Sequence, residues 1–235
     1  GSSDVYKRQG NPPLYFLLAR PFLYLPIKTE LALRFPAILG YLIASLTVYG
    51  FVRRDTGRIF AFLSIGMFLS CSFRIFAIEA RAYSLLLAFT GLAVFCWQSY
   101  CRSGKRSALA GISLSIVGAI FTHQYGAIYS MLPLIAGETV RGLRRRVVDP
   151  QVLYALAIPA PALLLTYPVM LHAQRELLSA IRSCPVFFAH PRWTDLKDYA
   201  LMVPPILLPP IALSFLALLL KLAVSKQSGE ESVAN

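Results

Sequence analysis

The stretch Ala77-Ile78-Glu79-Ala80-Arg81-Ala82-Tyr83-Ser84 places an acid and a base between two long apolar runs, residues 59–74 and 83–100. Ionisable groups at membrane depth are costly unless a partner or ligand compensates them, so Glu79 and Arg81 are candidate site residues. In a continuous helix, Glu79 and Tyr83 would share a face at spacing i, i+4, and Arg81 would point elsewhere. The alternative is a solvent-facing Glu79 and an Arg81 that extends to lipid headgroups.

The composition points to a membrane protein with several spans. Of its 235 residues, 57% are hydrophobic and 14% are charged, and the mean hydropathy is +0.60. These values are too apolar for a soluble domain. The net charge of +12 lies in short clusters between apolar runs, which is a topology signal, whereas nucleic-acid binding would need a basic strip with exposed aromatics. We therefore expect membrane lipids, and no nucleic acid, as partners.

Seven apolar segments predict transmembrane helices, so the expected fold class is an all-α polytopic membrane protein. The segments are residues 31–52, 59–74, 83–100, 107–121, 127–140, 151–171 and 201–222. The earlier run from Leu14 to Leu25 is too short to cross the bilayer and predicts a short helix at the extracytoplasmic interface. Residues 172–200 are expected to form a loop.

The expected organisation has four parts: residues 1–10, 11–30, 31–222 and 223–235. The first part resembles the translated end of a sequencing adapter, so we expect it to be foreign to the protein. The second carries the interfacial helix, and the third is the transmembrane domain. The last is polar and is expected to be a disordered cytoplasmic tail.

The basic residues also predict the orientation. Clusters at residues 53–58, 102–106 and 141–149 follow the first, third and fifth predicted spans. The positive-inside rule places these loops in the cytoplasm. The intervening polar groups then face the outside, namely Arg20, Arg34, Glu79, Arg81, His123 and the loop at 172–200.

Four short motifs occur in a fixed order along the chain: Asn11-Pro12-Pro13-Leu14-Tyr15-Phe16, Glu30-Leu31-Ala32-Leu33-Arg34-Phe35-Pro36, Glu79-Ala80-Arg81-Ala82-Tyr83 and Thr122-His123-Gln124-Tyr125. Over residues 11–147 the chain resembles the GT-C class of membrane glycosyltransferases. The similar branch contains protein O-mannosyltransferases and bacterial lipid A sugar transferases. Its first motif usually reads His-Pro-Pro-Leu-Tyr, and its third often reads Gln-Glu-Ala-Arg-Met-Tyr.

The resemblance implies an enzyme with a dolichyl- or polyprenyl-phosphate sugar as donor. It would transfer a hexose or pentose with inversion to a lipid, glycan or protein acceptor on the extracytoplasmic face of the bacterial inner membrane. The leaving phosphate calls for cationic donors, so Arg81 and Arg34 are the candidates to bind it. Glu79 and His123 are expected to support the reaction. Candidate residues for the substrate cleft are Tyr83, Tyr125, Pro12, Pro13 and Trp193.

Two departures from the family pattern bear on catalysis. Asn11 stands where the family usually has His, next to the suspected adapter. An acceptor hydroxyl must lose a proton as it attacks, which requires a carboxylate base. The resemblance implies that this acid lies in a loop upstream of Asn11, so we expect the fragment alone to be inactive. No cofactor is evident; Glu79 could orient a sugar hydroxyl, an arginine or a metal ion.

Structural interpretations remain open for several of these residues. Arg34 could contact headgroups, His123 could be a hydrogen-bonded structural residue, and Trp193 could anchor the chain at the interface. For the whole chain, the alternatives are a transporter or flippase, or a membrane subunit with a structural role. Proline pairs at residues 204–205 and 209–210 break the last predicted span and keep the transport alternative open.

Overall fold

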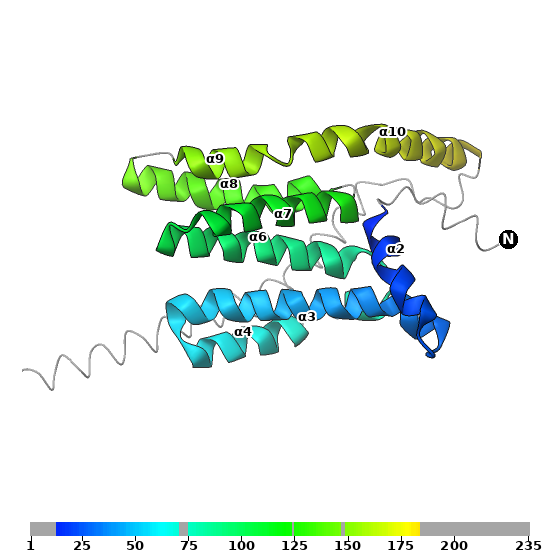
Figure 1. Ribbon diagram of the computed structural model, residues 1–235, viewed down its shortest axis with the longest axis horizontal. Coiled ribbons are helices and arrows are strands. Elements are labelled where there is room, and N and C mark those ends of the chain that lie inside the picture. The colour runs from blue at the N-terminus through cyan, green and yellow to red at the C-terminus, as the bar shows by residue number, and fades with distance from the viewer. Residues whose placement is uncertain (1–12, 71–74, 124, 147–148, 184–235) are drawn as a thin grey trace, which may run out of the picture. The chain divides into compact units, whose positions relative to one another are not determined.

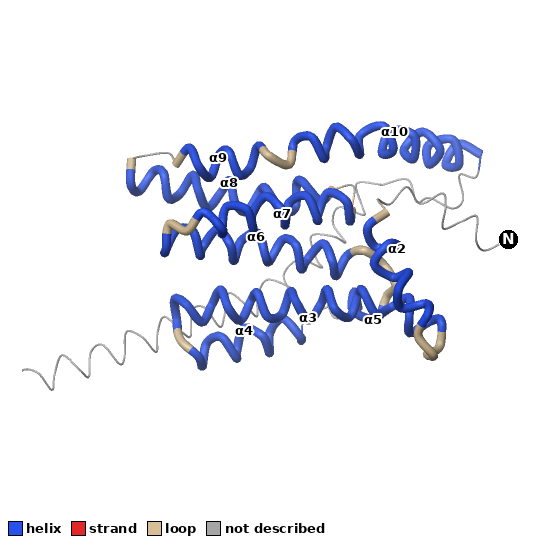
Figure 2. Tube along the Cα trace, in the orientation of Figure 1, coloured by secondary structure: helices blue, strands red, loops and turns tan. Residues whose placement is uncertain are grey.

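The computed structural model describes residues 13–70, 75–123, 125–146 and 149–183. Within these ranges every regular element is a helix (Figures 1 and 2), which confirms the predicted all-α class. Asn11, Pro12, Trp193 and the predicted span at 201–222 lie outside the described residues.

The helices follow one another through short turns. They are α2 (Leu14–Ala19), the 3-10 helix η1 (Arg20–Tyr24), α3 (Thr29–Thr56), α4 (Arg58–Ser70), α5 (Ile75–Ile78), α6 (Tyr83–Ser103), α7 (Arg106–Thr122), α8 (Gly126–Arg145), α9 (Pro150–Ala157) and α10 (Ala160–Ser183). Figure 1 shows the long helices side by side with α2 across one end of the bundle. Helix α6 is central, because it contacts α3, α7 and α8.

Three helical segments of the described chain are long and apolar enough to cross a membrane: Thr29–Thr56, Tyr83–Ser103 and Pro150–Pro168. They correspond to the predicted spans at 31–52, 83–100 and 151–171. The predicted spans at 59–74 and 107–121 appear as the shorter apolar helices Arg58–Ser70 and Arg106–Thr122. The structure therefore supports a membrane-spanning helical protein, with three candidate spans, by length and composition, among the described residues.

The short helix predicted after Pro13 is present as α2 and η1. Tyr15 is buried, and its hydroxyl donates a hydrogen bond of 2.7 Å to the carbonyl of Leu33 in α3. The same side chain packs in a cluster with Ala37 of α3 and with Ala82 and Leu85 at the start of α6. These contacts fix the short helix against the N-terminal parts of α3 and α6.

A glycine sets the close approach of α3 to α6. A Cβ atom on Gly40 would lie 2.7 Å from backbone atoms of Ser84 and Leu85. Only the missing side chain lets the two backbones pack at this distance. On the other side of α6, fully buried Ile112, Ile116 and further apolar side chains join α7 to α8 and α9 in a second core.

The predicted loop at residues 172–200 needs correction. Helix α10 continues to Ser183, so the first part of that stretch is helical. Its sequence holds helix-forming Ala, Gln, Arg, Glu and Leu and has no Gly or Pro between Pro168 and Pro185. The drop in hydropathy after Leu171 ends the apolar segment, but it does not end the helix.

Candidate functional site

The structure brings described parts of all four motifs to one end of the bundle. Helix α2 contacts α3 and α7, and α5 contacts α3 and α6. The first motif leads into α2, the second begins α3, the third links α5 to α6, and the fourth links α7 to α8. We call this region the motif end. It places Arg34, Glu79, Arg81, Tyr83, His123 and Tyr125 on neighbouring elements.

The link between α5 and α6 differs from the prediction of one continuous helix. Helix α5 ends at Ile78 and α6 begins at Tyr83, so Glu79 and Tyr83 do not share a helical face. Arg81 does not point away from Glu79. Its Nε lies 3.6 Å from Glu79 Oε2, and its backbone N–H donates to the Glu79 carbonyl at 2.8 Å. The break in the helix therefore brings the two charges together.

The Glu79–Arg81 pair is largely exposed, with 36% and 59% of the respective side chains accessible. Exposed pairs contribute about 0–1 kcal/mol, so this one leaves the Arg81 guanidinium available to a stronger anion. Arg34 lies on an exposed position near the start of α3. Within the described residues it has no hydrogen-bond or ion-pair partner. Two accessible guanidinium groups thus lie at the motif end.

An aromatic row connects the third and fourth motifs. The row comprises Phe76, Tyr83, His123 and Tyr125, with successive ring centroids 5.1, 5.3 and 5.7 Å apart. Tyr125 is 46% exposed, whereas His123 is 8% exposed. Two predicted cleft residues and one predicted supporting residue therefore meet directly.

His123 is held by three bonds around the turn between α7 and α8. Its backbone N–H donates to the Ala119 carbonyl at 3.0 Å, and its carbonyl accepts from Gly126 N–H at 2.8 Å. Its Nδ1 accepts from the backbone N–H of Tyr125 at 3.2 Å. Burial lowers the pKa of His123 below its ordinary value, so the imidazole is neutral at neutral pH.

Gly126 makes this tight turn possible. A Cβ atom at Gly126 would lie 1.9 Å from the carbonyl oxygen of Ala119, a distance that no side chain can tolerate. The first turn of α8 therefore packs against the last turn of α7. This packing fixes the two residues on either side of the turn, His123 and Tyr125.

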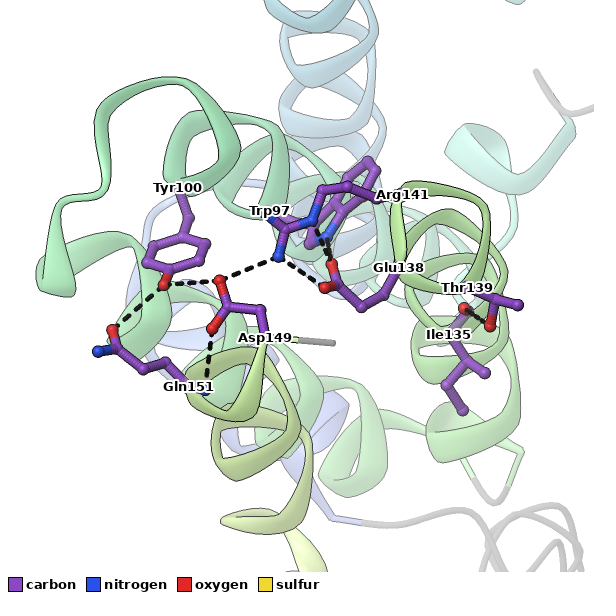
Figure 3. A network of polar contacts seen from close by, with 8 residues as sticks. All are labelled: Trp97, Tyr100, Ile135, Glu138, Thr139, Arg141, Asp149 and Gln151. Carbon is purple, nitrogen blue, oxygen red and sulfur yellow. Dashed lines mark hydrogen bonds and ion pairs between the residues drawn. The ribbon is translucent and has the colours of Figure 1, made fainter. Parts of the chain in front are cut away.

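At the opposite end, the charged residues form a network that was not among the sequence-based predictions (Figure 3). Glu138 of α8 is 5% exposed and accepts from Trp97 Nε1 of α6 at 3.0 Å. Arg141 donates to both oxygens of Glu138, at 2.9 and 2.6 Å, and to Asp149 at 3.0 Å. The hydroxyl of Tyr100 also donates to Asp149 at 3.0 Å. The network joins α6, α8 and the start of α9.

A second set of contacts at this end joins α3 to α6. Arg102 donates to Asp55 Oδ1 at 2.7 Å, and Gln98 donates to Asp55 Oδ2 at 2.6 Å. The guanidinium of Arg54 lies over the ring of Phe95, 3.8 Å from its centroid. We call this region the basic end, since residues of the three clusters at 53–58, 102–106 and 141–149 gather there.

The sequence contained one signal of the network at the basic end. Glu138 and Arg141 stand at spacing i, i+3, at which a helix brings an acid and a base together. The bond between Trp97 and Glu138 spans 41 residues and depends on which helices are neighbours. Within the part of the chain that the structure describes, no group of three His, Cys, Asp or Glu residues could hold a metal ion.

Comparison with known proteins supports the resemblance drawn from the motifs. No curated protein and no solved structure matches the chain. A family model described as dolichyl-phosphate-mannose-protein mannosyltransferase matches residues 10–172, a range that contains all four motifs. The chain is a membrane glycosyltransferase of the mannosyltransferase type, and it belongs to the dolichyl-phosphate-mannose-protein mannosyltransferase family.

Proposed function

We propose that the protein transfers a sugar, with inversion, from a polyprenyl-phosphate donor to a lipid, glycan or protein acceptor of the bacterial envelope. The convergence of the four motifs on one end of the bundle carries this proposal. The basic clusters gather at the other end, and the positive-inside rule assigns that end to the cytoplasm. On this assignment the motif end is the active, extracytoplasmic face.

Arg81 and Arg34 are proposed to bind the donor phosphate. As the bond between the anomeric carbon and the phosphate oxygen breaks, negative charge grows on the phosphate. Guanidinium groups stabilise that charge through charge-assisted, bidentate hydrogen bonds. Arg81 contacts Glu79 weakly and through Nε, which leaves its terminal nitrogens for the phosphate. Through its contact with Nε, Glu79 then orients the Arg81 guanidinium.

The acceptor supplies the other half of the reaction. Its hydroxyl oxygen attacks the anomeric carbon on the face opposite the phosphate, and its proton passes to a carboxylate base. The family resemblance points to a base upstream of Asn11. Pro12 and Pro13, which precede α2, are proposed to line the cleft with Tyr83 and Tyr125. Trp193 is proposed for the acceptor side.

The proposal is tested with Arg81→Ala in the full-length protein. We expect transfer from a labelled polyprenyl-phosphate sugar to fall by about 10² to 10³, the effect of losing one donor to a developing charge. The thermal unfolding midpoint should stay unchanged, because the pair with Glu79 is exposed. Arg102→Ala, at the basic end, is the matched control and should transfer normally.

Two results would overturn the proposal. Normal turnover in Arg81→Ala would remove this arginine from the site. A wild-type protein that moves a lipid-linked substrate across vesicle membranes without transferring its sugar would replace the enzyme with the transporter or flippase alternative.

A further inference from the structure

The hydrogen bond at Nδ1 fixes the tautomer of His123. A backbone N–H can only donate, so the nitrogen that accepts the Tyr125 N–H cannot carry a proton of its own. In a neutral imidazole the remaining hydrogen is then on Nε2. His123 therefore presents an N–H donor at Nε2 and has no free lone pair on either ring nitrogen.

This donor is unused in a side chain that is more than nine-tenths buried. Among the described residues, His123 Nε2 has no hydrogen-bond partner. The Nε2 atom is also not fully enclosed by the protein. In that part of the chain one side-chain polar atom is both fully enclosed and without a partner, and it is Thr90 Oγ1. A buried ring thus carries one N–H without a partner, and its centroid lies 5.7 Å from that of the exposed Tyr125 ring.

We propose that these two side chains form a subsite for the transferred sugar, an inference that rests on the proposed function. His123 Nε2–H donates to a hydroxyl or ring oxygen of the sugar, and the ring of Tyr125 stacks on its C–H face. A pyranose offers these two surfaces, neutral oxygen acceptors and an apolar face. The phosphate would favour the charged guanidinium groups over a neutral imidazole.

The tautomer also defines what His123 does not do. A nitrogen that already carries hydrogen cannot take the proton of the acceptor hydroxyl, and the lone pair of Nδ1 is engaged by Tyr125. His123 is therefore a binding residue for the sugar and not the general base.

Two substitutions of His123 by amide residues distinguish the roles of its two ring nitrogens. The side-chain nitrogen of Gln reaches the position of Nε2, whereas that of Asn reaches only the position of Nδ1. The measurement is the ratio of Kd values for bare polyprenyl phosphate and for the sugar-bearing donor, with full-length protein in lipid nanodiscs. We expect His123→Gln to keep the wild-type ratio, and His123→Asn to lower it about tenfold, which is the loss of about 1.4 kcal/mol.

Binding of the bare polyprenyl phosphate is the internal control for folding, and it should be equal in both variants. Equal ratios in the Gln and Asn variants, or a wild-type protein that binds both ligands equally, would overturn the sugar subsite. Failure of the proposed function would give a different result. Arg81→Ala would then bind the bare lipid and the sugar-bearing donor with the wild-type Kd values. Tyr125→Ala should lower the ratio without affecting the bare lipid.

Discussion

The two ends of the bundle differ in how their charged side chains are paired and buried. At the basic end, Arg141 bonds to buried Glu138 of the same helix at 2.6 and 2.9 Å and to Asp149, at the start of α9, at 3.0 Å. Trp97 of α6 donates to the same glutamate at 3.0 Å. At the motif end, Glu79 and Arg81 form an exposed contact of 3.6 Å. Charges that are fully paired between helices hold those helices together. Charges that keep free donors remain available for a ligand.

The largest effect on folding is expected from Glu138→Ala. The change removes the acceptor of the Trp97 N–H and leaves the Arg141 guanidinium bonded to Asp149 alone. Removing one partner of a buried pair costs about 3–5 kcal/mol. Denaturant unfolding in detergent should show this loss, while transfer per folded molecule stays normal. A loss no larger than that of the exposed-pair variant Arg102→Ala would show that the network does not stabilise the basic end.

A smaller loss of stability is expected at Gly40, where α3 packs closely against α6, since these two helices run between the two ends. In Gly40→Val the new side chain meets the backbone of Ser84 and Leu85, and overpacking of this kind costs about 1–3 kcal/mol. Because α6 must shift at its first turn, transfer should fall as well. Gly66→Ala is the control, since no atom lies within 4 Å of a Cβ there. Normal stability in Gly40→Val would mean that α3 and α6 separate easily.

The next effect depends on pH. Burial alone would raise the pKa of Asp149, but hydrogen bonds from Arg141 and Tyr100 outweigh it and hold this pKa below the usual value. A carboxyl with a lowered folded-state pKa stabilises the fold above the ordinary Asp pKa of about 3.9 and loses this effect as the pH falls through the lower value. Asp149→Asn should cost about 1–2 kcal/mol at neutral pH and less in acid. A constant difference across pH would contradict this.

The smallest effect on folding is expected from Glu79→Gln. Since the pair with Arg81 is exposed, its removal should change the free energy of unfolding by less than about 1 kcal/mol. Transfer should nevertheless fall, because Arg81 loses the carboxylate that orients it. A loss of stability comparable to that of Glu138→Ala would remove the difference between the two ends.

Much of the fold could be predicted from hydropathy and motif order. Apolar runs predicted the helical membrane class, and the run after Pro13 predicted a short helix. The family resemblance was also correct. These features depend on local composition or on short motifs, which a single sequence displays directly.

The remaining features depend on contacts between distant segments. The stretch 79–82 could continue a helix by composition, but the helix breaks there, and α6 begins beside Gly40 of α3. Ring contact between Tyr83 and His123 requires α6 and α7 to be neighbours. Hydropathy also marks the end of an apolar segment more clearly than the end of a helix. The predicted span therefore ends at residue 171, whereas helix α10 continues to Ser183.

The turn at Gly57 has a consequence for how the chain enters the membrane. It separates α3 from α4 by one residue, with φ of 93°, a conformation that glycine adopts without strain. The described part of helix α4 has 13 residues, or about 20 Å at 1.5 Å per residue, and it packs against α3. Because a single residue connects two helices that pack on each other, we expect α3 and α4 to enter the membrane together, as one hairpin.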